Sequence, residues 1–301
     1  MAIRAVVVGG TSGIGYAMAC RVAAQASTNS SPAGSPAAGS VIISGRTKPT
    51  NIPHSNMEFR ALDATSMRQI KQYTDALKSD LQPGQALDYL IMTQGIMTTA
   101  GRTETPEEGI DRKMALHYYG KQLLIRELLP ALKEDAKIII VFDGLLGSPS
   151  KLNWEDLDLK KTYGLSKAAD HCMAMNDCMV QYWAATAAAA AAAQKKTQQQ
   201  HFVHAWPGGV NTSLHRELPW YLRPVARAAL GLVGVSPDTC ARNLLNGTAE
   251  CAEAGGEEGR FWSNIDNKGR LIKNKAVWSE EQMRRVADHT WEIVDAAIIT
   301  K

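Results

Sequence analysis

Short apolar runs alternate along the chain with longer stretches in which apolar residues recur at helical spacing. The apolar runs are continuous and rich in β-branched residues, which is typical of strands buried on both faces of a parallel sheet. Strands are predicted over 3–8, 41–44, 87–93, 137–142 and 201–206, and helices over 14–25, 66–78, 106–129 and 163–193. This order predicts an α/β fold of the Rossmann type, with a doubly wound parallel sheet in three α/β/α layers.

The start of one helix is marked by local capping signals. Thr105 precedes Pro106, and Glu108 follows three residues after the threonine. A threonine N-cap, a proline in the first turn and a glutamate that reaches back to the cap are typical of a helix N-terminus. We therefore predict that a helix begins at Pro106.

Two segments of biased composition interrupt this pattern. Residues 26–40 are rich in Ser, Ala, Pro and Gly, and residues 184–200 pass from polyalanine into a run rich in Gln and Lys. Because the cost of closing a loop depends only weakly on its length, we interpret both as insertions in surface connections. The sequence has no internal repeat and no dividing linker, so we predict one domain over residues 1–301.

Composition and charge narrow the class of protein. The 301 residues include 33 Lys and Arg against 30 Asp and Glu, a net charge of +3, which gives no electrostatic reason to expect a nucleic-acid partner. The five cysteines contain no CxxC pair, so we expect no disulfide framework, no metal site and a reducing compartment, the cytoplasm. No apolar stretch is long enough for a membrane span, and we expect no signal sequence.

A glycine cluster lies between the first predicted strand and the first predicted helix. Gly9, Gly13 and Gly15 allow a tight turn and a close approach of a pyrophosphate to the backbone. The helix N-terminus that follows offers free N–H groups and a favourable dipole to the phosphate charge. The predicted phosphate contacts are Gly9, Thr11, Ser12, Gly13, Ile14 and Gly15.

A tyrosine and a lysine form a candidate acid–base pair. Of the eight tyrosines, only Tyr163 is followed four residues later by a lysine, Lys167. On a helix this spacing places both side chains on one face. A nearby ammonium stabilises a phenolate and lowers the pKa of the phenol toward neutral pH. We therefore predict that Tyr163 acts as the acid or base and that Lys167 tunes it.

These motifs occur once each, in a fixed order that ends with the loop Pro207-Gly-Gly-Val-Asn-Thr212 after the last predicted strand. The glycine spacing, the Tyr163–Lys167 pair and this loop resemble the short-chain dehydrogenase/reductase family in its short, single-domain form. The resemblance extends over about residues 3–261. It implies an oxidoreductase that transfers a hydride between a nicotinamide coenzyme and a carbonyl or alcohol group.

The resemblance also implies contacts to the coenzyme. Family members that use NAD usually carry an acid at the end of the second strand, whereas Arg46 stands there in this chain and suits the 2′-phosphate of NADP. NADP (NADPH) is therefore expected, and NAD is the weaker alternative. Asp63 matches the position that contacts the adenine, and Lys167 the one that holds the nicotinamide ribose. Further implied contacts are Gly95, Tyr163, Val210 and Thr212.

The chain departs from the family at the serine that normally hydrogen-bonds the substrate oxygen. Asp143 or Gly144 occupies that position, and an ionised Asp143 would repel a developing alkoxide. Three interpretations stay open. Asp143 is protonated and donates, Ser148 or Ser150 takes the place of the serine, or the chain is catalytically impaired.

A second departure concerns the helix asparagine that supports a proton-relay water in the family. His117 aligns with it and either holds a water and moves protons or is a structural histidine.

Residues 212–236 correspond to the substrate lid of the family. Their aromatic and apolar residues, Trp220 and Tyr221 among them, suit a hydrophobic or aromatic carbonyl compound, while a segment on a membrane surface is the alternative. We predict an NADP(H)-dependent enzyme of the carbonyl reductase type that acts on an apolar small molecule. A homo-oligomer is compatible with this prediction. The alternative function is a catalytically degenerate family member that binds NADP as a sensor or scaffold.

Overall fold

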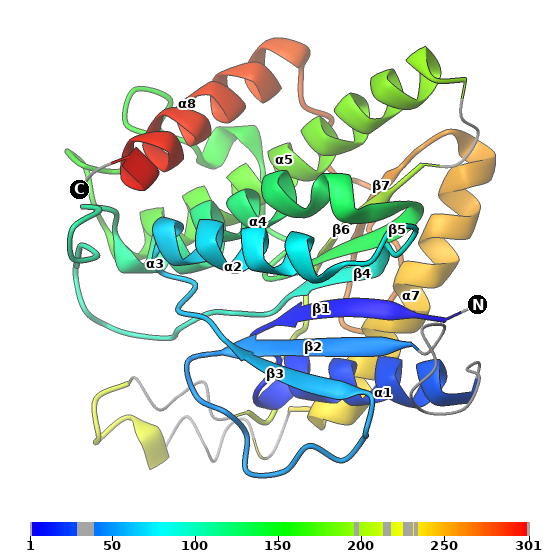
Figure 1. Cartoon of the computed structure of the whole chain (residues 1–301). Coiled ribbons are helices and arrows are strands. Elements are labelled where there is room, and N and C mark those ends of the chain that lie inside the picture. Colours follow the sequence, from blue (N-terminus) through cyan, green and yellow to red (C-terminus); the bar gives the residue numbers. More distant parts are fainter. Residues whose placement is uncertain are drawn as a thin grey trace.

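A single parallel sheet crosses the centre of the molecule (Figure 1). The computed structural model describes residues 2–28, 39–195, 199–212, 218–224, 231 and 234–299, and within these ranges the sheet has seven strands in the order β3-β2-β1-β4-β5-β6-β7. The strands are β1 (Arg4–Val8), β2 (Ser40–Gly45), β3 (Met57–Ala61), β4 (Leu87–Met92), β5 (Leu132–Val141), β6 (His201–Ala205) and β7 (Trp262–Ile265). The doubly wound α/β fold predicted from the sequence is confirmed.

Helices cover both faces of this sheet (Figure 1). On one face α1 packs against α7, and on the other α2 packs against α4 while α5 packs against α8. The helices are α1 (Gly13–Thr28), α2 (Met67–Asp80), α3 (Arg112–Met114), α4 (Gly120–Leu128), α5 (Leu165–Ala193), α7 (Pro237–Glu258) and α8 (Glu280–Ile299). The described residues also include a π-helical turn, η1 (Ala115–Tyr119), and two 3-10 turns, η2 (Leu129–Ala131) and η3 (Pro149–Lys151).

The continuous apolar runs are explained by two cores, one on each face of the sheet. Along β1, Val6 and Val8 pack into the core beneath α2, α4 and α5. Ala5 and Val7 pack into the core beneath α1 and α7. Because successive side chains of a strand point to opposite faces, every residue of such a strand must be apolar.

Two strands escaped the sequence prediction because they lie at the edges of the sheet. In β3 only Met57 is buried, and its neighbours include Glu58 and Arg60, which pair with each other at 2.7 Å. In β7 the buried residues Ser263 and Asn264 are polar. Neither segment therefore shows a run of apolar residues. β5 also begins five residues earlier than predicted, at Leu132.

The predicted helix start at Pro106 is wrong. Residues 105–110 form a turn in which Glu107 and Gly109 adopt positive φ values of 69° and 65°. The carboxylate of Glu108 caps α2 instead, because it accepts hydrogen bonds from Ser66 Oγ at 2.7 Å and from Met67 N at 2.8 Å. Helical structure begins at Arg112, with Asp111 as the N-cap.

The biased segments and the predicted lid lie only partly within the described residues. The polyalanine run continues α5 to Ala193, as a long helix. Residues 29–38, 196–198, 213–217, 225–230 and 232–233, which belong to the predicted insertions and lid, lie outside the described residues.

Candidate active site

The glycine turn between β1 and α1 has a backbone that only glycine adopts easily. Gly9 and Gly13 have φ values of 80° and 58°. A Cβ at Gly9 would lie 2.6 Å from Gln94 N, and one at Gly15 would collide with the Thr93 hydroxyl at the end of β4. The turn is therefore packed directly against the neighbouring strand end, with no side chain between backbone and cleft.

This turn forms one wall of a cleft of about 690 Å³ at the carboxyl ends of β1, β2 and β4. The volume falls in the range of small-molecule and cofactor sites, roughly 300–1,000 Å³. Ten residues predicted as coenzyme contacts line the cleft together, namely Gly9, Thr11, Ser12, Gly13, Ile14, Gly15, Arg46, Asp63, Gly95 and Thr212. Val210, Tyr163 and Lys167 are not among its lining residues.

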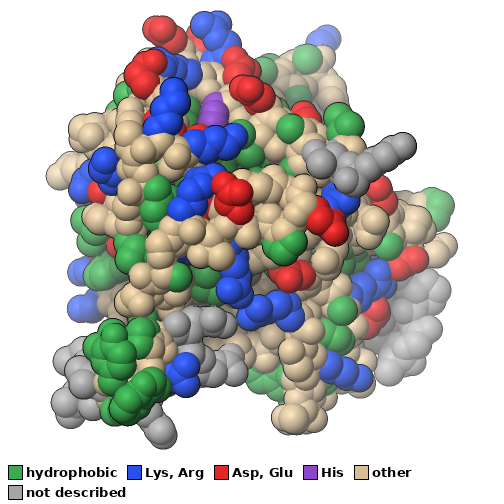
Figure 2. All heavy atoms as spheres, turned by 90° about the vertical axis from the view of Figure 1, so that its left-hand side faces the viewer, with side chains coloured by type: hydrophobic (Ala, Val, Ile, Leu, Met, Phe, Trp, Pro, Cys, Tyr) green, Lys and Arg blue, Asp and Glu red, His purple; other side chains and the backbone are tan. Residues whose placement is uncertain are grey.

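Three cations line the cleft, of which only Arg46 was predicted. Lys48 follows it in the loop after β2, and Arg112 is the first residue of α3. Arg46 and Lys48 are exposed, and in the described part of the chain none of the three pairs with a carboxylate. Figure 2, which views the side on which the strands end, shows Lys and Arg side chains across this face. Lys48 lies two residues after Arg46, so the sequence could have predicted it as a second cation of the cleft. Arg112 is far from both in the sequence and reaches the cleft only through the fold.

The loop after β6 reaches the glycine turn, although β4 and β5 lie between β6 and β1 in the sheet. A Cβ at Gly13 would lie 3.2 Å from Thr212 Cγ2. Gly208 turns the chain with a φ of 68°, and Val210 forms a bridge with Val235. The Pro207–Thr212 motif therefore brings Thr212 to the start of α1.

His117 supports the floor of the cleft. Its Nε2 accepts a hydrogen bond at 2.9 Å from the backbone N–H of Ile96, a cleft residue at the end of β4. Burial, helped by the ammonium groups of Lys121 and Lys113, lowers the pKa of His117 to about 3. The imidazole is therefore neutral at physiological pH and acts as an acceptor toward the strand end.

The tyrosine and lysine of the predicted pair do not share a helix face. α5 begins at Leu165, after an extended Gly164 with φ −161° and ψ 147°, so Tyr163 precedes the helix. Lys167 is exposed, and its side chain makes no hydrogen bond or ion pair in the described structure. The expected geometry of the pair is wrong because it assumed that the helix already includes residue 163.

Tyr163 is enclosed by the segment between β4 and α3. Lys113 Nζ lies 5.3 Å from the centroid of its ring and donates to Gly101 O at 2.7 Å. The Tyr163 hydroxyl is buried without a hydrogen-bond partner in the described structure. Burial, followed by the negative charge of Asp111, raises the pKa of Tyr163, the opposite of the predicted direction.

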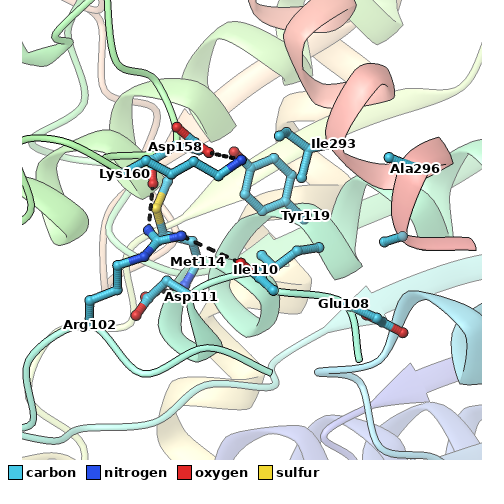
Figure 3. A pocket seen from close by; sticks show the side chains of 12 residues that line it. Arg102, Glu108, Ile110, Asp111, Met114, Tyr119, Asp158, Lys160, Ile293 and Ala296 are labelled. Carbon is cyan, nitrogen blue, oxygen red and sulfur yellow. Dashed lines mark hydrogen bonds and ion pairs between the residues drawn. The ribbon is translucent and has the colours of Figure 1, made fainter. Parts of the chain in front are cut away.

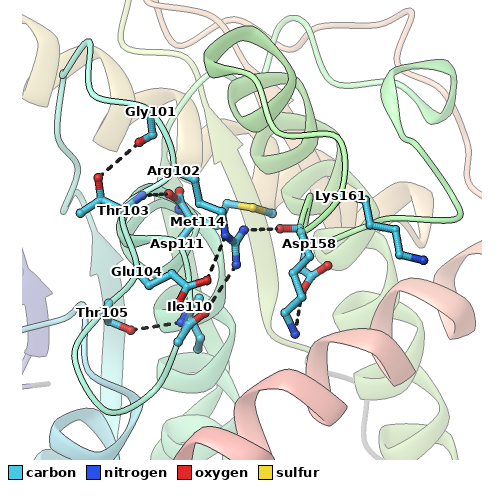
Figure 4. Close-up of polar contacts among 12 residues, drawn as sticks. Gly101, Arg102, Thr103, Glu104, Thr105, Ile110, Asp111, Met114, Asp158 and Lys161 are labelled. Atoms are coloured by element: carbon cyan, nitrogen blue, oxygen red, sulfur yellow. Dashed lines mark hydrogen bonds and ion pairs between the residues drawn. The ribbon is translucent and has the colours of Figure 1, made fainter.

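Arg102 links the segment between β4 and α3 to the loop before α5. Its guanidinium donates to Asp158 O at 2.9 Å and to Glu104 Oε1 at 3.2 Å (Figure 4). Behind it lies a cavity of about 100 Å³ that Arg102, Asp158 and Tyr119 line together with Ile293 of α8 (Figure 3). This volume is well below that of usual ligand pockets, so the cavity is too small for a coenzyme.

Asp143 turns back onto its own loop rather than into the cleft. Its Oδ1 accepts hydrogen bonds from Leu145 N at 2.9 Å and Leu146 N at 3.3 Å. A Cβ at Gly144 would overlap the carbonyl oxygen of His204, so no serine fits at that position as the chain stands. Ser148 and Ser150 lie within 2.7 Å of each other and mark the start of η3, where Ser148 is the N-cap.

The described residues contain neither a cluster of metal ligands nor a helix suited to a membrane. Among the described residues, no three His, Cys, Asp or Glu side chains gather as metal ligands. None of the described helices combines the length and apolar character needed to cross a membrane.

The chain matches a family model and is similar to two proteins that are named oxidoreductases. The family model of the short chain dehydrogenases matches residues 4–176, more than half of the chain. The oxidoreductase AN1596 of Emericella nidulans is 32% identical over 224 residues, which cover 71% of this chain and 60% of that protein. The oxidoreductase andH of Emericella variicolor is 26% identical over 223 residues, which cover 70% and 59%. The chain thus spans about 60% of the length of these relatives.

Similar solved structures share the fold. The NADPH-bound carbonyl reductase from chicken fatty liver has a TM-score of 0.56 at 17% identity, with 90% of this chain and 99% of that chain covered. A short-chain dehydrogenase/reductase from Burkholderia multivorans with bound NADP has a TM-score of 0.57, again at 17% identity, with the same coverage.

The matched residues run from β1 through the glycine turn and Tyr163 into α5. They include the cleft-lining turn and most strands of the sheet. The order of the strands and the shape of the glycine turn agree with this match. The chain therefore belongs to the short-chain dehydrogenase family.

Proposed function

We propose that the protein is an NADP(H)-dependent oxidoreductase that transfers a hydride between the nicotinamide and a carbonyl or alcohol group of an apolar small molecule. The observation that carries this proposal is the cleft, where a glycine turn and a helix N-terminus stand together with cations that have no acidic partner in the described structure. Membership of the family and relatives named oxidoreductases support the class of reaction.

The residues of the cleft fit a dinucleotide. The positive φ of Gly9 and Gly13 and the missing Cβ of Gly15 would let a pyrophosphate approach the first N–H groups of α1. Arg46 and Lys48 would hold a 2′-phosphate, which distinguishes NADP from NAD. Two solved structures of this fold hold NADPH or NADP.

The chain's own groups would handle the proton. When bound, the nicotinamide supplies or accepts the hydride. In the reductive direction the Tyr163 hydroxyl, which is protonated at neutral pH, would give its proton to the carbonyl oxygen. Lys167 would hold the ribose, and His117 would keep the end of β4 in place through Ile96.

Exposed apolar side chains support an apolar substrate. Met97 follows β4, and Leu145 and Leu146 follow β5, so all three lie where the parallel strands end. Trp220 is 78% exposed and Tyr221 is 60% exposed in the segment proposed as the lid, residues 212–236. A substrate with aromatic or aliphatic surface would cover such side chains.

Coenzyme titration tests the first half of the proposal. NADPH should bind more tightly than NADH, and Arg46→Ala should weaken NADPH by about tenfold or more while leaving NADH nearly unchanged. Lys161→Ala, which removes an exposed cation outside the cleft, is the control. Equal affinities for the two coenzymes would contradict the assignment of Arg46.

Measurement of NADPH oxidation tests the second half of the proposal, the hydride transfer to a carbonyl compound. A panel of aromatic aldehydes and ketones should oxidise NADPH in the presence of the enzyme. Tyr163→Phe should remove this turnover and leave the affinity for NADPH largely intact. Turnover that survives this substitution would reject Tyr163 as the acid.

A coenzyme-binding protein without turnover is the second candidate function. It is favoured by Tyr163, which does not line the cleft, and by Asp143, which caps its own loop. Tight NADPH binding without oxidation of NADPH by any carbonyl compound would support this candidate.

We further propose a single domain that works in the cytoplasm. The one sheet from β1 to β7 supports the first point. All five cysteines are free thiols, which suits a reducing compartment.

A further inference from the structure

Four buried polar side chains form a cluster behind the loop that follows β5. The cluster consists of Asp177 on α5, His204 on β6, Asn264 on β7 and Lys275 between β7 and α8. The first three are fully buried, and the Lys275 side chain is 5% exposed. Because charged side chains are seldom buried unless they are paired, the contacts of this cluster indicate its role.

The carboxylate of Asp177 joins the other three members. Its Oδ2 forms an ion pair with Lys275 Nζ. Its Oδ1 accepts a hydrogen bond from Asn264 Nδ2 at 2.5 Å and lies 2.5 Å from His204 Nδ1. Asp177 is thus the shared anchor of a buried network.

Asn264 and Lys275 also hold the loop after β5. Asn264 Nδ2 donates to Gly144 O at 2.9 Å. Lys275 Nζ donates to Gly147 O at 2.8 Å and to Leu145 O at 3.3 Å. Three carbonyl groups within four residues are therefore drawn toward Asp177.

Helix α5 also holds the segment that carries Lys275. One turn after Asp177, Gln181 donates to Ala276 O at 2.9 Å and accepts from Trp278 N at 3.0 Å. A Cβ at Gly147 would overlap Asp177 Oδ2, so the loop lies directly against the carboxylate. The cluster therefore fixes the loop from two elements at once.

We propose that Asp177 is a positioning residue of the active site, which acts through Asn264 and Lys275 on the loop 143–147. With the carbonyls of this loop turned inward, its apolar side chains Leu145 and Leu146 face solvent at the carboxyl end of β5, 41% and 53% exposed. The loop would form the substrate-side rim of the site, and this part of the proposal rests on the proposed function.

Hydrogen–deuterium exchange of a peptide covering residues 143–148 tests the proposal in the coenzyme-free protein and needs no substrate. Asp177→Asn and the double variant Asp177→Asn/Lys275→Met should accelerate exchange in this peptide by about tenfold. The double variant replaces both charges with neutral groups of similar size, so it avoids a buried unpaired charge. Leu124→Ala, a core variant on α4, is the control for general destabilisation. Exchange that rises equally in the Leu124→Ala control would overturn the proposal.

Kinetics separate this role from the proposed function. With a carbonyl compound that the wild type reduces, both cluster variants should raise KM by about tenfold, roughly the loss of one charged hydrogen bond, and leave NADPH affinity within about twofold. An unchanged KM would overturn the proposed role at the rim. A wild type without turnover would reject the proposed function, and the exchange experiment would then decide whether Asp177 positions the loop.

Discussion

Lys121 is a fully buried lysine, and its environment makes a quantitative prediction about stability. Its Nζ donates to Val141 O at 3.1 Å and lies 5.3 Å from the centroid of the Phe142 ring. In the described structure it forms no ion pair with a carboxylate. Its titratable neighbours are the thiol of Cys172 and the imidazole of His117, and neither supplies a fixed negative charge. Burial therefore lowers the pKa of Lys121 from 10.5 to about 7.

This pKa shift makes stability depend on pH in a defined direction. Between pH 7 and 10.5 the unfolded chain holds a proton on Lys121 that the folded chain has lost, so stability rises with pH across this window. One pKa unit is worth about 1.4 kcal/mol, so burial of the protonated lysine lowers the free energy of unfolding by roughly 5 kcal/mol at low pH. About 4 kcal/mol of this destabilisation is still present at pH 7. Loss of the bond to Val141 O would offset about 1–2 kcal/mol.

Lys121→Met is the perturbation that tests this reasoning, because methionine keeps much of the volume and removes the charge. Urea unfolding at pH 7 should show a gain of about 2–3 kcal/mol for the variant. The rise of stability between pH 7 and 9.5 should also flatten relative to the wild type. Lys161→Met, at an exposed position, should change neither. A variant that is less stable at pH 7, or that keeps the wild-type pH slope, would refute the argument.

Three further predictions concern other parts of the fold. Glu108→Ala should lower the free energy of unfolding by about 2 kcal/mol, because α2 loses its capping carboxylate, and an unchanged thermal melt would contradict this. Gly15→Ala should abolish NADPH binding in calorimetry while circular dichroism stays native, and binding at wild-type affinity would argue against the assignment of the cleft. The buried thiols with raised pKa should resist alkylation at pH 8 as judged by mass spectrometry, and rapid labelling would show that the core opens there. They are Cys172, Cys178 and Cys240.

The sequence was sufficient for the parts of the molecule that depend on local chemistry. The glycine turn was predicted correctly because its positive φ angles require glycine at fixed spacing. The parallel sheet was predictable because strands buried on both faces must be apolar throughout. In β7 the buried Asn264 is polar because it bonds to Asp177, so β7 shows no apolar run and was not predicted.

Local sequence signals led to wrong predictions at two places. Glu108 has the spacing of a capping box, yet it caps α2, some forty residues earlier in the chain. Tyr163 has the spacing of a helical pair, yet Gly164 is extended and separates it from α5. The Asp177 cluster gave no signal in the sequence, because His204 and Asn264 follow Asp177 by 27 and 87 residues and reach it only through the fold.

The close contact between Gly144 and His204 O also limits how this chain can change in evolution or by design. Any side chain at residue 144, three residues after β5 ends, would overlap the backbone of His204 in β6. Of the two positions that align with the family's serine, 143 and 144, only residue 143 can therefore carry a hydroxyl, and there Asp143 now stabilises the loop through two backbone N–H groups. A substitution of Asp143 by serine would exchange this loop-stabilising carboxylate for a hydrogen-bond donor, so the two roles compete for one residue.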